Sequence, residues 1–345
     1  MDEKATLSRA MTLDEFLAEW RSESSRITVH TSGSTGKPKV MSVEKSRMEA
    51  SARITCSFLG LGAADTALLC MPLDYIAGKM VVVRSLVGGM RLISVHPSSH
   101  PLLALQKAPT FAAMVPMQVF CSMQSEHELR LLRGIRNLII GGGAVDAGLA
   151  ARLRSFPNAV WSTYGMTETL SHIALRRLSG IGASDYYTPF SGVALSVDDE
   201  GCLIIDAPAV CAQRLMTNDI VEFHPDGRRF RIVGRRDNVI DSGGVKIHAE
   251  QVEERLRGRL SCDFAVTRRP HPQYGEIVVL LVALADGAGR NAALCRIKEI
   301  CGEVLPKYWQ PKEIHSAPSI PYTETGKIAR MEVQKLVEEG RTMVL

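Results

Sequence analysis

Short apolar segments alternate with segments of helical character over residues 66–165, and this alternation is the feature that most limits the possible folds. Apolar strands separated by helices predict a mostly parallel sheet with helices on both of its faces. The predicted strands lie in residues 66–73, 90–95, 109–115, 135–140 and 158–165, and the predicted helices in 42–61, 76–89, 116–125 and 146–156. A first helix is predicted over residues 11–20, with Thr12 as its N-cap and Glu15 three residues on.

Three predicted strands run directly into loops rich in glycine, serine or threonine. Strand 26–30 precedes the loop 31–39, strand 135–140 precedes Gly141–Gly143, and strand 158–165 precedes the segment 166–169. In open α/β sheets, ligands bind in the crevice beyond the carboxyl ends of the strands. The sequence therefore predicts that these loops converge on one binding crevice.

The character of the sequence changes after about residue 180, where shorter segments are separated by Gly, Pro and Asp. The sequences Asp-Glu-Gly at 199–201 and Asp-Gly at 226–227 are typical of β-hairpin turns. From about residue 237, helices and strands alternate again in an α+β pattern. We therefore predict an N-terminal domain over residues 1–236, with its β-rich part at about 181–236, and a smaller C-terminal α+β domain over 237–345.

The composition argues for a soluble cytoplasmic protein. Hydrophobic residues make up 46% and charged residues 23%, and the net charge is +4 without an aromatic-studded basic stripe, so nucleic acid is not expected as a partner. None of the eight cysteines forms a Cys-x-x-Cys pair, which favours reduced thiols over zinc sites or disulfides. The most apolar run, 79–90, is interrupted by Arg84 and is shorter than the ~20 residues that span a bilayer. The oligomeric state stays open.

The loop "TSGSTGKPK" at residues 31–39 superficially resembles a Walker loop. A Walker loop requires a glycine five positions before Gly36, where this chain has Thr31, and a hydroxyl after Lys37, where it has Pro38. What remains is a loop of backbone amides, hydroxyls and cations after a strand, which suits a polyphosphate ligand. A flexible glycine–serine turn is the alternative.

The same loop resembles the phosphate loop of the adenylate-forming superfamily, which includes acyl-CoA synthetases, peptide-synthetase adenylation domains and luciferases. Four further motifs resemble the signatures of that superfamily and follow in its order. They are "STYGMTET" (162–169), "TNDIVEF" (217–223), "GRRDNVIDSGGVKIHAEQVE" (234–253) and "PYTETGKIAR" (321–330). Five motifs in order over about 300 residues identify the chain as a member.

The resemblance implies that ATP, Mg²⁺ and coenzyme A take part in the reaction. An acid carboxylate attacks the α-phosphorus of ATP, so the enzyme must neutralise the triphosphate and fix the attack in line. Glu168 matches the Mg²⁺ ligand, a hard oxygen donor for a hard cation, and Thr167 matches the residue that contacts the α-phosphate. The residues expected to hold the phosphates are Thr31, Ser32, Gly33, Ser34, Thr35, Gly36 and Lys39.

The other motifs imply a nucleoside site and a mobile C-terminal domain. Lys327 matches the lysine that stabilises charge at the carboxylate and α-phosphate during adenylation, and Asp237 matches the hinge of the domain rotation. Asp219, with Arg235 beside it, would bind the ribose, although Asn218 replaces the glycine of the family. The backbone or side chains of Gly141, Gly142, Gly143, Tyr164 and Gly165 would contact adenine, and Gly243 and Gly244 would line the tunnel for the pantetheine of CoA.

Only about thirty residues precede the phosphate loop, and "SHIALR" follows the Mg²⁺ motif. This layout resembles the compact o-succinylbenzoate–CoA ligases of menaquinone biosynthesis. Arg84 falls where that subfamily places an arginine near the succinyl carboxylate of the substrate, and an arginine fork suits a carboxylate. Lys79 is a second candidate, and Ser171 and His172 complete the expected acid site.

Three other functions stay open on the sequence alone. The chain could be a CoA ligase for another aryl or acyl acid, because Asp74 and Tyr75 replace a Phe-His pair that is common in the family. It could also load a carrier protein, or be a nucleotide-binding relic without catalysis. The presence of both Glu168 and Lys327 argues against a relic.

Overall fold

The computed structural model describes residues 10–30, 40–285, 287, 289–323, 327–340 and 342–344. Its contacts divide the chain into two compact units, and each is described by itself. Unit 1 comprises residues 1–145, 152–194 and 206–214, and unit 2 comprises 146–151, 195–205 and 215–345. This division assigns part of the β-rich segment to the C-terminal unit, while the predicted functional boundary at Asp237 stays a prediction.

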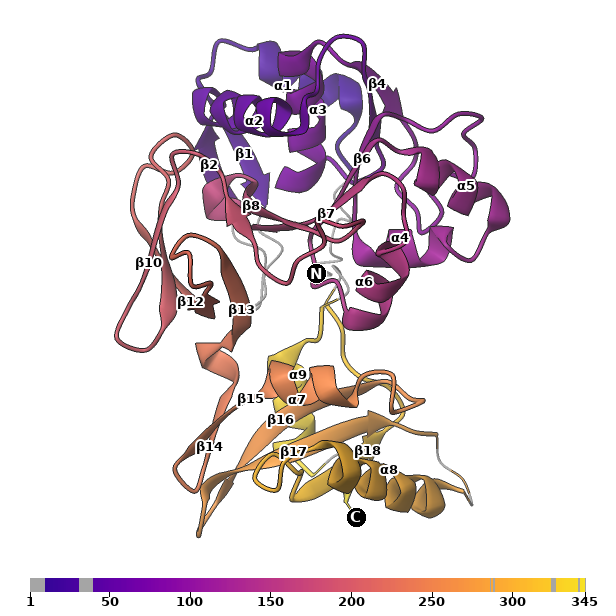
Figure 1. The fold of residues 1–345 in the computed structure, drawn as a ribbon, viewed down its shortest axis with the longest axis vertical. Coiled ribbons are helices and arrows are strands. Elements are labelled where there is room, and N and C mark those ends of the chain that lie inside the picture. Colours follow the sequence, from indigo (N-terminus) through magenta and orange to yellow (C-terminus); the bar gives the residue numbers. More distant parts are fainter. Residues whose placement is uncertain are drawn as a thin grey trace, which may run out of the picture. The chain divides into compact units, whose positions relative to one another are not determined.

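Unit 1 is built on a seven-stranded sheet of order β4-β3-β5-β6-β7-β8-β9. Figure 1 labels β4, β6, β7 and β8 of this sheet. The strands β3 to β7 pair in parallel, and β8 and β9 continue the sheet in antiparallel pairs. This arrangement confirms the predicted α/β class. The strands are β3 (Thr66–Leu69), β4 (Arg91–Ser94), β5 (Phe111–Met114), β6 (Asn137–Ile140), β7 (Ala159–Gly165), β8 (His172–Arg177) and β9 (Thr188–Pro189).

Helices α2 (Lys45–Leu59) and α3 (Ile76–Gly88) pack against each other beside this sheet. Both helices end at a glycine in the left-handed conformation, Gly60 with φ 62° and Gly89 with φ 65°. Most of α3 is buried, and a Cβ on Gly78 would lie 2.3 Å from the carbonyl oxygen of Pro72, so only glycine fits there. Unit 1 also contains α4 (Pro116–Ser122) and α5 (Glu126–Gly134), and the residues of α6 (Ala147–Leu153) are divided between the two units.

The N-terminal part begins with α1 (Leu13–Arg21), which starts at the predicted cap. The Thr12 side chain accepts from the Glu15 amide, and Glu15 accepts in return from the Thr12 amide, which completes a capping box. Strands β1 (Arg26–His30) and β2 (Val40–Glu44) then form an antiparallel pair. The predicted start of the second helix at residue 42 was wrong, because residues 40–44 pair with β1.

Unit 2 contains two sheets. Strands β10 to β13 form a four-stranded antiparallel sheet, and the left-handed Gly201 (φ 79°) and Gly227 (φ 69°) occupy the predicted turns. The second sheet has six strands. The bounds are β10 (Ala194–Val197), β11 (Cys202–Asp206), β12 (Leu215–Phe223), β13 (Phe230–Arg235), β14 (Val239–Ser242), β15 (Val245–His248), β16 (Phe264–His271), β17 (Gly275–Ala283), β18 (Glu313–Ala317) and β19 (Met343–Val344).

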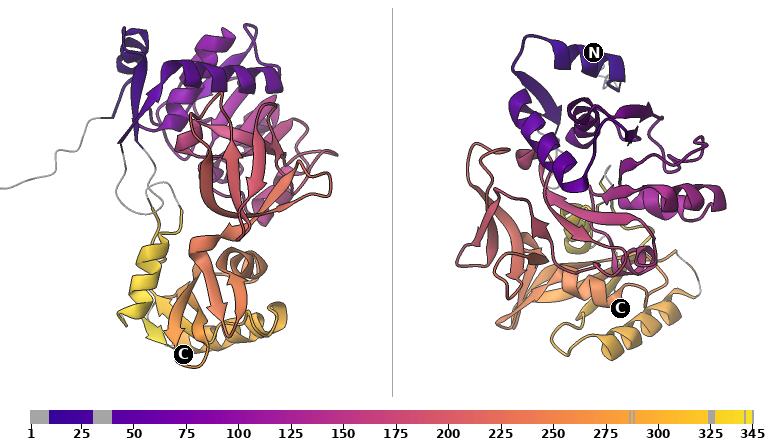
Figure 2. Two further views of the ribbon diagram at one scale, coloured as in Figure 1. Left: turned by 90° about the vertical axis from the view of Figure 1, so that its left-hand side faces the viewer. Right: turned by 45° about the horizontal axis from the view of Figure 1, so that its top comes forward.

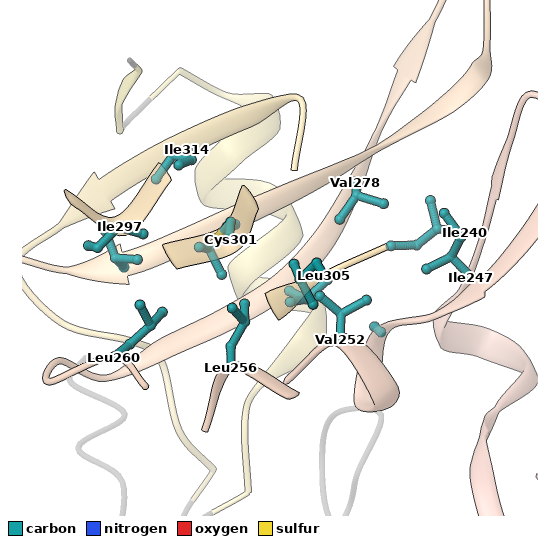
Figure 3. Close-up of a cluster of buried hydrophobic side chains, with 14 of the residues drawn as sticks. Ile240, Ile247, Val252, Leu256, Leu260, Val278, Ile297, Cys301, Leu305 and Ile314 are labelled. Carbon is teal, nitrogen blue, oxygen red and sulfur yellow. The ribbon is translucent and has the colours of Figure 1, made fainter. Parts of the chain in front are cut away.

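Helices cover both faces of the six-stranded sheet. Helices α7 (Ala249–Leu256) and α8 (Arg290–Val304) pack on the face that carries Val278 and Leu280 (Figure 3), and α9 (Arg330–Glu338) packs on the opposite face (Figure 2). Burial on both faces explains why β17 is an almost continuous apolar run. No helix in the described part of the chain is long and apolar enough to cross a membrane.

Candidate active site

The segment 162–169 lies at the carboxyl end of β7, as predicted. The strand ends at Gly165, a 3₁₀ turn covers Thr167–Thr169, and Leu170 reverses the chain into β8 with a φ of 64°. Leu170 is the one non-glycine residue with positive φ among those described, and such a backbone costs energy that the surroundings must offset. A Cβ on Gly165 would lie 2.2 Å from the Ser171 carbonyl oxygen, so the close return of the chain requires glycine.

This turn separates two pairs of side chains. Thr167 and Glu168 lie on the outer side of the turn, where the Glu168 carboxylate is exposed and accepts no hydrogen bond from a residue that the structure describes. Ser171 and His172 lie after the turn, and His172 is 7% exposed. The turn therefore presents one carboxylate to solvent and aims the next polar pair into the interior.

The glycines after β6 lie at the same edge of the sheet. A Cβ on Gly141 would lie 2.3 Å from the Thr163 hydroxyl, and Gly142 has a φ of 77°. Tyr164 is buried, and its ring lies 5.9 Å from that of Tyr187. Because the carboxyl ends of parallel strands share one edge, these two loops leave the sheet at the same edge, as predicted. That they form one binding crevice with the loop 31–39, and that they contact adenine, stay predictions.

Arg84 is a buried cation without a carboxylate partner among the described residues. It lies on α3, is 2% exposed, and its Nη2 donates to the Ser171 hydroxyl. Its Nε is buried and donates to no described group. Burial lowers the pKa of Arg84 to about 10. The guanidinium therefore keeps its charge at neutral pH and has a donor available for an anion.

His172 lies between Ser171 and the α2 helix. Its Nδ1 is 3.2 Å from the Ser171 Oγ, and its Nε2 is 3.1 Å from the Thr55 Oγ1. Burial, and then the charge of Arg84, lowers the pKa of His172 well below its ordinary value of 6.5. The ring is therefore neutral at neutral pH. The predictions did not include Thr55, which is 117 residues away along the chain.

Lys79 lies on the same helix but has different partners. It is 1% exposed, and its Nζ lies 3.7 Å from the Glu19 carboxylate and 5.2 Å from the centre of the Phe16 ring on α1. Burial lowers the pKa of Lys79, and the charge of Glu19 opposes this shift. The structure thus gives Lys79 a counterion on α1 and brings Arg84, Ser171 and His172 together.

In unit 2, the predicted ribose residues are cross-strand partners. Asp219 on β12 lies opposite Arg235 on β13, and Arg235 Nη1 donates to Asp219 Oδ1 at 3.2 Å. Arg235 Nη2 also donates to Asp237 at 2.9 Å, and the Asn218 amide donates to both oxygens of Asp237 at 3.1 Å. Asn218, where the family has glycine, therefore contacts the predicted hinge residue directly.

Lys327 precedes α9 and lies next to Ile328, which forms an isolated antiparallel bridge with Tyr322. The Thr323 amide donates to the Lys327 carbonyl at 2.7 Å, and the Lys327 amide donates to the Thr323 hydroxyl at 3.1 Å. Lys327 exposes much of its surface. Desolvation by the surrounding protein, and then the charge of Arg235, lower the pKa of Lys327, whereas the charge of Asp219 acts to raise it. Lys327, Arg235 and Asp219 thus interact electrostatically within unit 2.

Gly243 and Gly244 form the two-residue turn between β14 and β15. Their φ values are 63° and 82°, which is the backbone of a tight hairpin turn and favours glycine at both positions. This conformation explains both glycines without a ligand, so their contact with CoA stays a prediction. The predicted phosphate-loop residues 31–39 lie outside the described residues.

Comparisons with known proteins show the family of this chain. A family model described as AMP-binding enzyme matches residues 6–206, more than half of the chain, and one described as AMP-binding enzyme C-terminal domain matches residues 263–327. The 2-succinylbenzoate–CoA ligase of Enterococcus faecalis is 27% identical over 339 residues, which cover 89% of this chain and 69% of that protein.

Two solved structures are also similar. An acyl-CoA synthetase (AMP-forming)/AMP-acid ligase II-like protein of Dyadobacter fermentans is 34% identical with a TM-score of 0.62, and the match covers 93% of each chain. The o-succinylbenzoate CoA synthetase of Bacillus subtilis, solved with its acyl-adenylate intermediate, is 21% identical with a TM-score of 0.73, covering 89% of this chain and 68% of that one. The chain therefore belongs to the AMP-binding enzyme family and has the adenylate-forming fold of the AMP-forming acyl-CoA synthetases.

Proposed function

We propose that this protein is an acid–thiol ligase for o-succinylbenzoate, acting in menaquinone biosynthesis. In the first step, one acid carboxylate attacks the α-phosphorus of ATP and releases pyrophosphate. In the second step, the thiol of CoA attacks the acyl-adenylate and releases AMP. The observation that supports this substrate best is Arg84, a buried cation with no carboxylate partner among the described residues.

A dicarboxylic acid explains Arg84 better than a simple fatty acid does. A buried charge is costly unless it is paired, and a substrate carboxylate would supply the missing counterion. One carboxylate would bind Arg84, and the other would be activated. Lys79 already has Glu19 as counterion and is less suited to this role.

Glu168 is the candidate for the Mg²⁺ ligand. Its carboxylate is exposed at the 3₁₀ turn, has no described partner, and offers the hard oxygen that Mg²⁺ prefers. Bound Mg²⁺ would neutralise part of the triphosphate charge. Thr167, beside Glu168, would contact the α-phosphate, and the loop 31–39 would hold the other phosphates.

Unit 2 would supply the remaining roles. Asp219 would accept from the ribose hydroxyls beside Arg235, and Lys327 would stabilise the charge that develops between carboxylate and α-phosphate. Rotation about Asp237 would then replace Lys327 by the turn Gly243–Gly244 next to the pantetheine. This proposal keeps residues 1–236 and 237–345 as the two functional domains.

Coupled AMP release with ATP, Mg²⁺ and CoA tests the substrate. We expect turnover with o-succinylbenzoate and at least 100-fold lower kcat/KM with benzoate, succinate and fatty acids, a discrimination typical of a site built for a second polar group. Faster turnover of another acid would contradict o-succinylbenzoate. Acid-dependent ATP–pyrophosphate exchange without CoA-dependent AMP release would contradict CoA as the acceptor and favour a carrier protein.

Lys327→Ala tests the two-step assignment. We expect adenylate formation to fall by roughly 100-fold, as for the loss of one preorganised charge. Thioester formation from pre-made acyl-adenylate should change little, because Lys327 would have left the site in that step. Equal loss in both half-reactions would contradict the rotation, and Lys298→Ala, a substitution on α8, is the matched control.

A further inference from the structure

A continuous series of hydrogen bonds runs from Arg84 to the backbone of α2, and it is partly buried at Ser171 and buried between His172 and α2. Arg84 Nη2 contacts the Ser171 Oγ, which lies 3.2 Å from His172 Nδ1. His172 Nε2 lies 3.1 Å from the Thr55 Oγ1, which donates to the carbonyl oxygen of Ser51 at 3.1 Å. The four side chains come from α3, the turn before β8, β8 itself and α2, and nothing in the reaction proposed above requires His172 or Thr55.

Donor and acceptor chemistry fixes the direction of every bond in this chain. The Ser51 carbonyl oxygen can only accept, so it takes the single hydroxyl proton of Thr55. Thr55 Oγ1 must then accept from His172 Nε2–H. A neutral imidazole carries one N–H, so its Nδ1 accepts the hydroxyl proton of Ser171. Ser171 is left with lone pairs only, and one of them accepts from Arg84.

Electrostatics supports the neutral ring that this direction requires. The positive charge of Arg84 and the burial of His172 both oppose a second proton on the imidazole. No carboxylate of the described residues forms an ion pair with Arg84 or His172. The hydrogen bonds therefore satisfy Arg84 Nη2 while leaving the charge of the guanidinium uncompensated, and its buried Nε remains without a described acceptor.

We infer that His172 and Thr55 are positioning residues for the acid, which act through Ser171 on the orientation of the Arg84 guanidinium and do not touch the acid themselves. This inference rests on the proposed function, in which Arg84 binds a substrate carboxylate. Because the Ser171 hydroxyl donates its proton to His172, it can accept a hydrogen bond from Arg84 but has no proton left to donate to the acid. These hydrogen bonds would thus fix the Nη2 of the guanidinium and leave its other N–H groups for the substrate carboxylate.

The hydrogen-bond direction is tested by NMR on the full chain labelled with ¹⁵N at histidine. His172→Gln identifies the resonance. We expect His172 to be protonated at Nε2 only, and Thr55→Val, which removes the hydroxyl at nearly constant shape, to weaken this preference. Thr55→Ser keeps the hydroxyl and should preserve it. A His172 ring protonated at Nδ1 would overturn the inference.

The role of these hydrogen bonds in acid binding is tested by steady-state kinetics with o-succinylbenzoate. We expect Thr55→Val to raise KM for this acid about tenfold, which corresponds to the loss of one buried hydrogen bond in a network that includes a charge. The values of kcat and of KM for ATP should stay within about twofold, and Thr55→Ser should behave like wild type. Ser171→Ala interrupts the chain one step closer to Arg84 and should have at least the same effect.

A double-mutant cycle separates positioning from a general structural effect. In the Arg84→Met background, Thr55→Val should have no further effect on kcat/KM, because the two substitutions act on one contact. Additive losses, or an equal loss for a monocarboxylic analogue, would overturn the inference. Failure of the wild type to turn over o-succinylbenzoate would instead contradict the proposed function, and with it the role assigned to this chain of bonds.

Discussion

Two arginines in this protein differ in their electrostatic surroundings and in their burial. The Arg330 side chain is 24% exposed, whereas Arg84 is 2% exposed. Arg330 on α9 donates to both carboxylate oxygens of the buried Glu253, at 2.7 and 2.8 Å, and to the Val266 carbonyl. Burial works to lower the pKa of Arg330, but Glu253 raises it above its ordinary value. Arg84 has only a serine hydroxyl as a described partner, and burial lowers its pKa to about 10.

The difference separates a structural cation from one that is available for a ligand. Arg330 and Glu253 connect α9, α7 and β16, and their charges cancel within the protein. Arg84 is more deeply buried than Arg330 and has no carboxylate among the described residues to offset its desolvation penalty. A protein retains such a group when a ligand supplies the opposite charge, which is the basis of the substrate proposed here.

The largest expected effect comes from breaking the paired arginine. Arg330→Met leaves the Glu253 carboxylate buried without its cation, and we expect the free energy of unfolding to fall by about 3 kcal/mol. Urea denaturation followed by circular dichroism measures this change. Adding Glu253→Gln should restore part of the loss, and a change below about 1 kcal/mol would show that Arg330 is not a structural cation.

The same substitution at the unpaired arginine should have the opposite sign. Arg84→Met removes a buried charge that has no internal counterion and replaces it with an apolar side chain of similar length. We therefore expect the free energy of unfolding to stay the same or to rise by about 1 kcal/mol in the same urea experiment. A loss comparable with that of Arg330→Met would mean that Arg84 is needed for folding, and the comparison between the two arginines would fail.

The pH dependence of stability should report the neutral ring beside Arg84. The pKa of His172 lies below 6.5 in the folded state, so the unfolded chain binds more protons as the pH falls through 6.5. The free energy of unfolding should decrease by up to about 1.4 kcal/mol per pH unit below that value. His248 also has a lowered pKa and contributes in the same direction.

His172→Gln distinguishes the two histidines in this experiment. The variant should keep only the slope that His248 produces between pH 7 and pH 5. An unchanged slope would show that His172 is protonated in the folded protein, against its position next to Arg84.

Lys79→Met should have the smallest effect on stability. Its counterion Glu19 is partly exposed and can turn toward water when the ammonium is lost. We expect the free energy of unfolding to change by less than about 1 kcal/mol. A loss near that of Arg330→Met would place Lys79 among the structural cations.

Periodicity and caps predicted most of the fold. The strand–helix alternation of residues 66–165 gave the parallel sheet, and Thr12 with Glu15 marked the start of α1. Strand β2 was not anticipated, because its residues Ser42 to Glu44 continue without a break into the sequence of α2. Its pairing with β1 is a contact between two separate segments, which local patterns do not show.

The sequence motifs identified the candidate site residues but did not show which side chains contact each other. The sequence did not distinguish Arg84 from Lys79 as the cation that binds the acid. The contact of Lys79 with Glu19 on α1 appears only in the structure. Thr55 was missed because a threonine inside an amphipathic helix has no signal of its own. The positive φ of Leu170 was missed for a similar reason, since leucine does not favour that conformation.

The most direct test compares acids that differ in one carboxylate, in the wild type and in Arg84→Met. Coupled AMP release should be measured with o-succinylbenzoate, with 4-oxo-4-phenylbutanoate, which lacks the ring carboxylate, and with 2-butanoylbenzoate, which lacks the succinyl carboxylate. We expect the wild type to prefer o-succinylbenzoate by roughly 100-fold in kcat/KM over the monoacid that keeps the activated carboxylate, and Arg84→Met to lose that preference. The other monoacid should release no AMP with either enzyme, because it lacks the carboxylate that attacks ATP. A preference over the reactive monoacid that survives Arg84→Met would contradict the account.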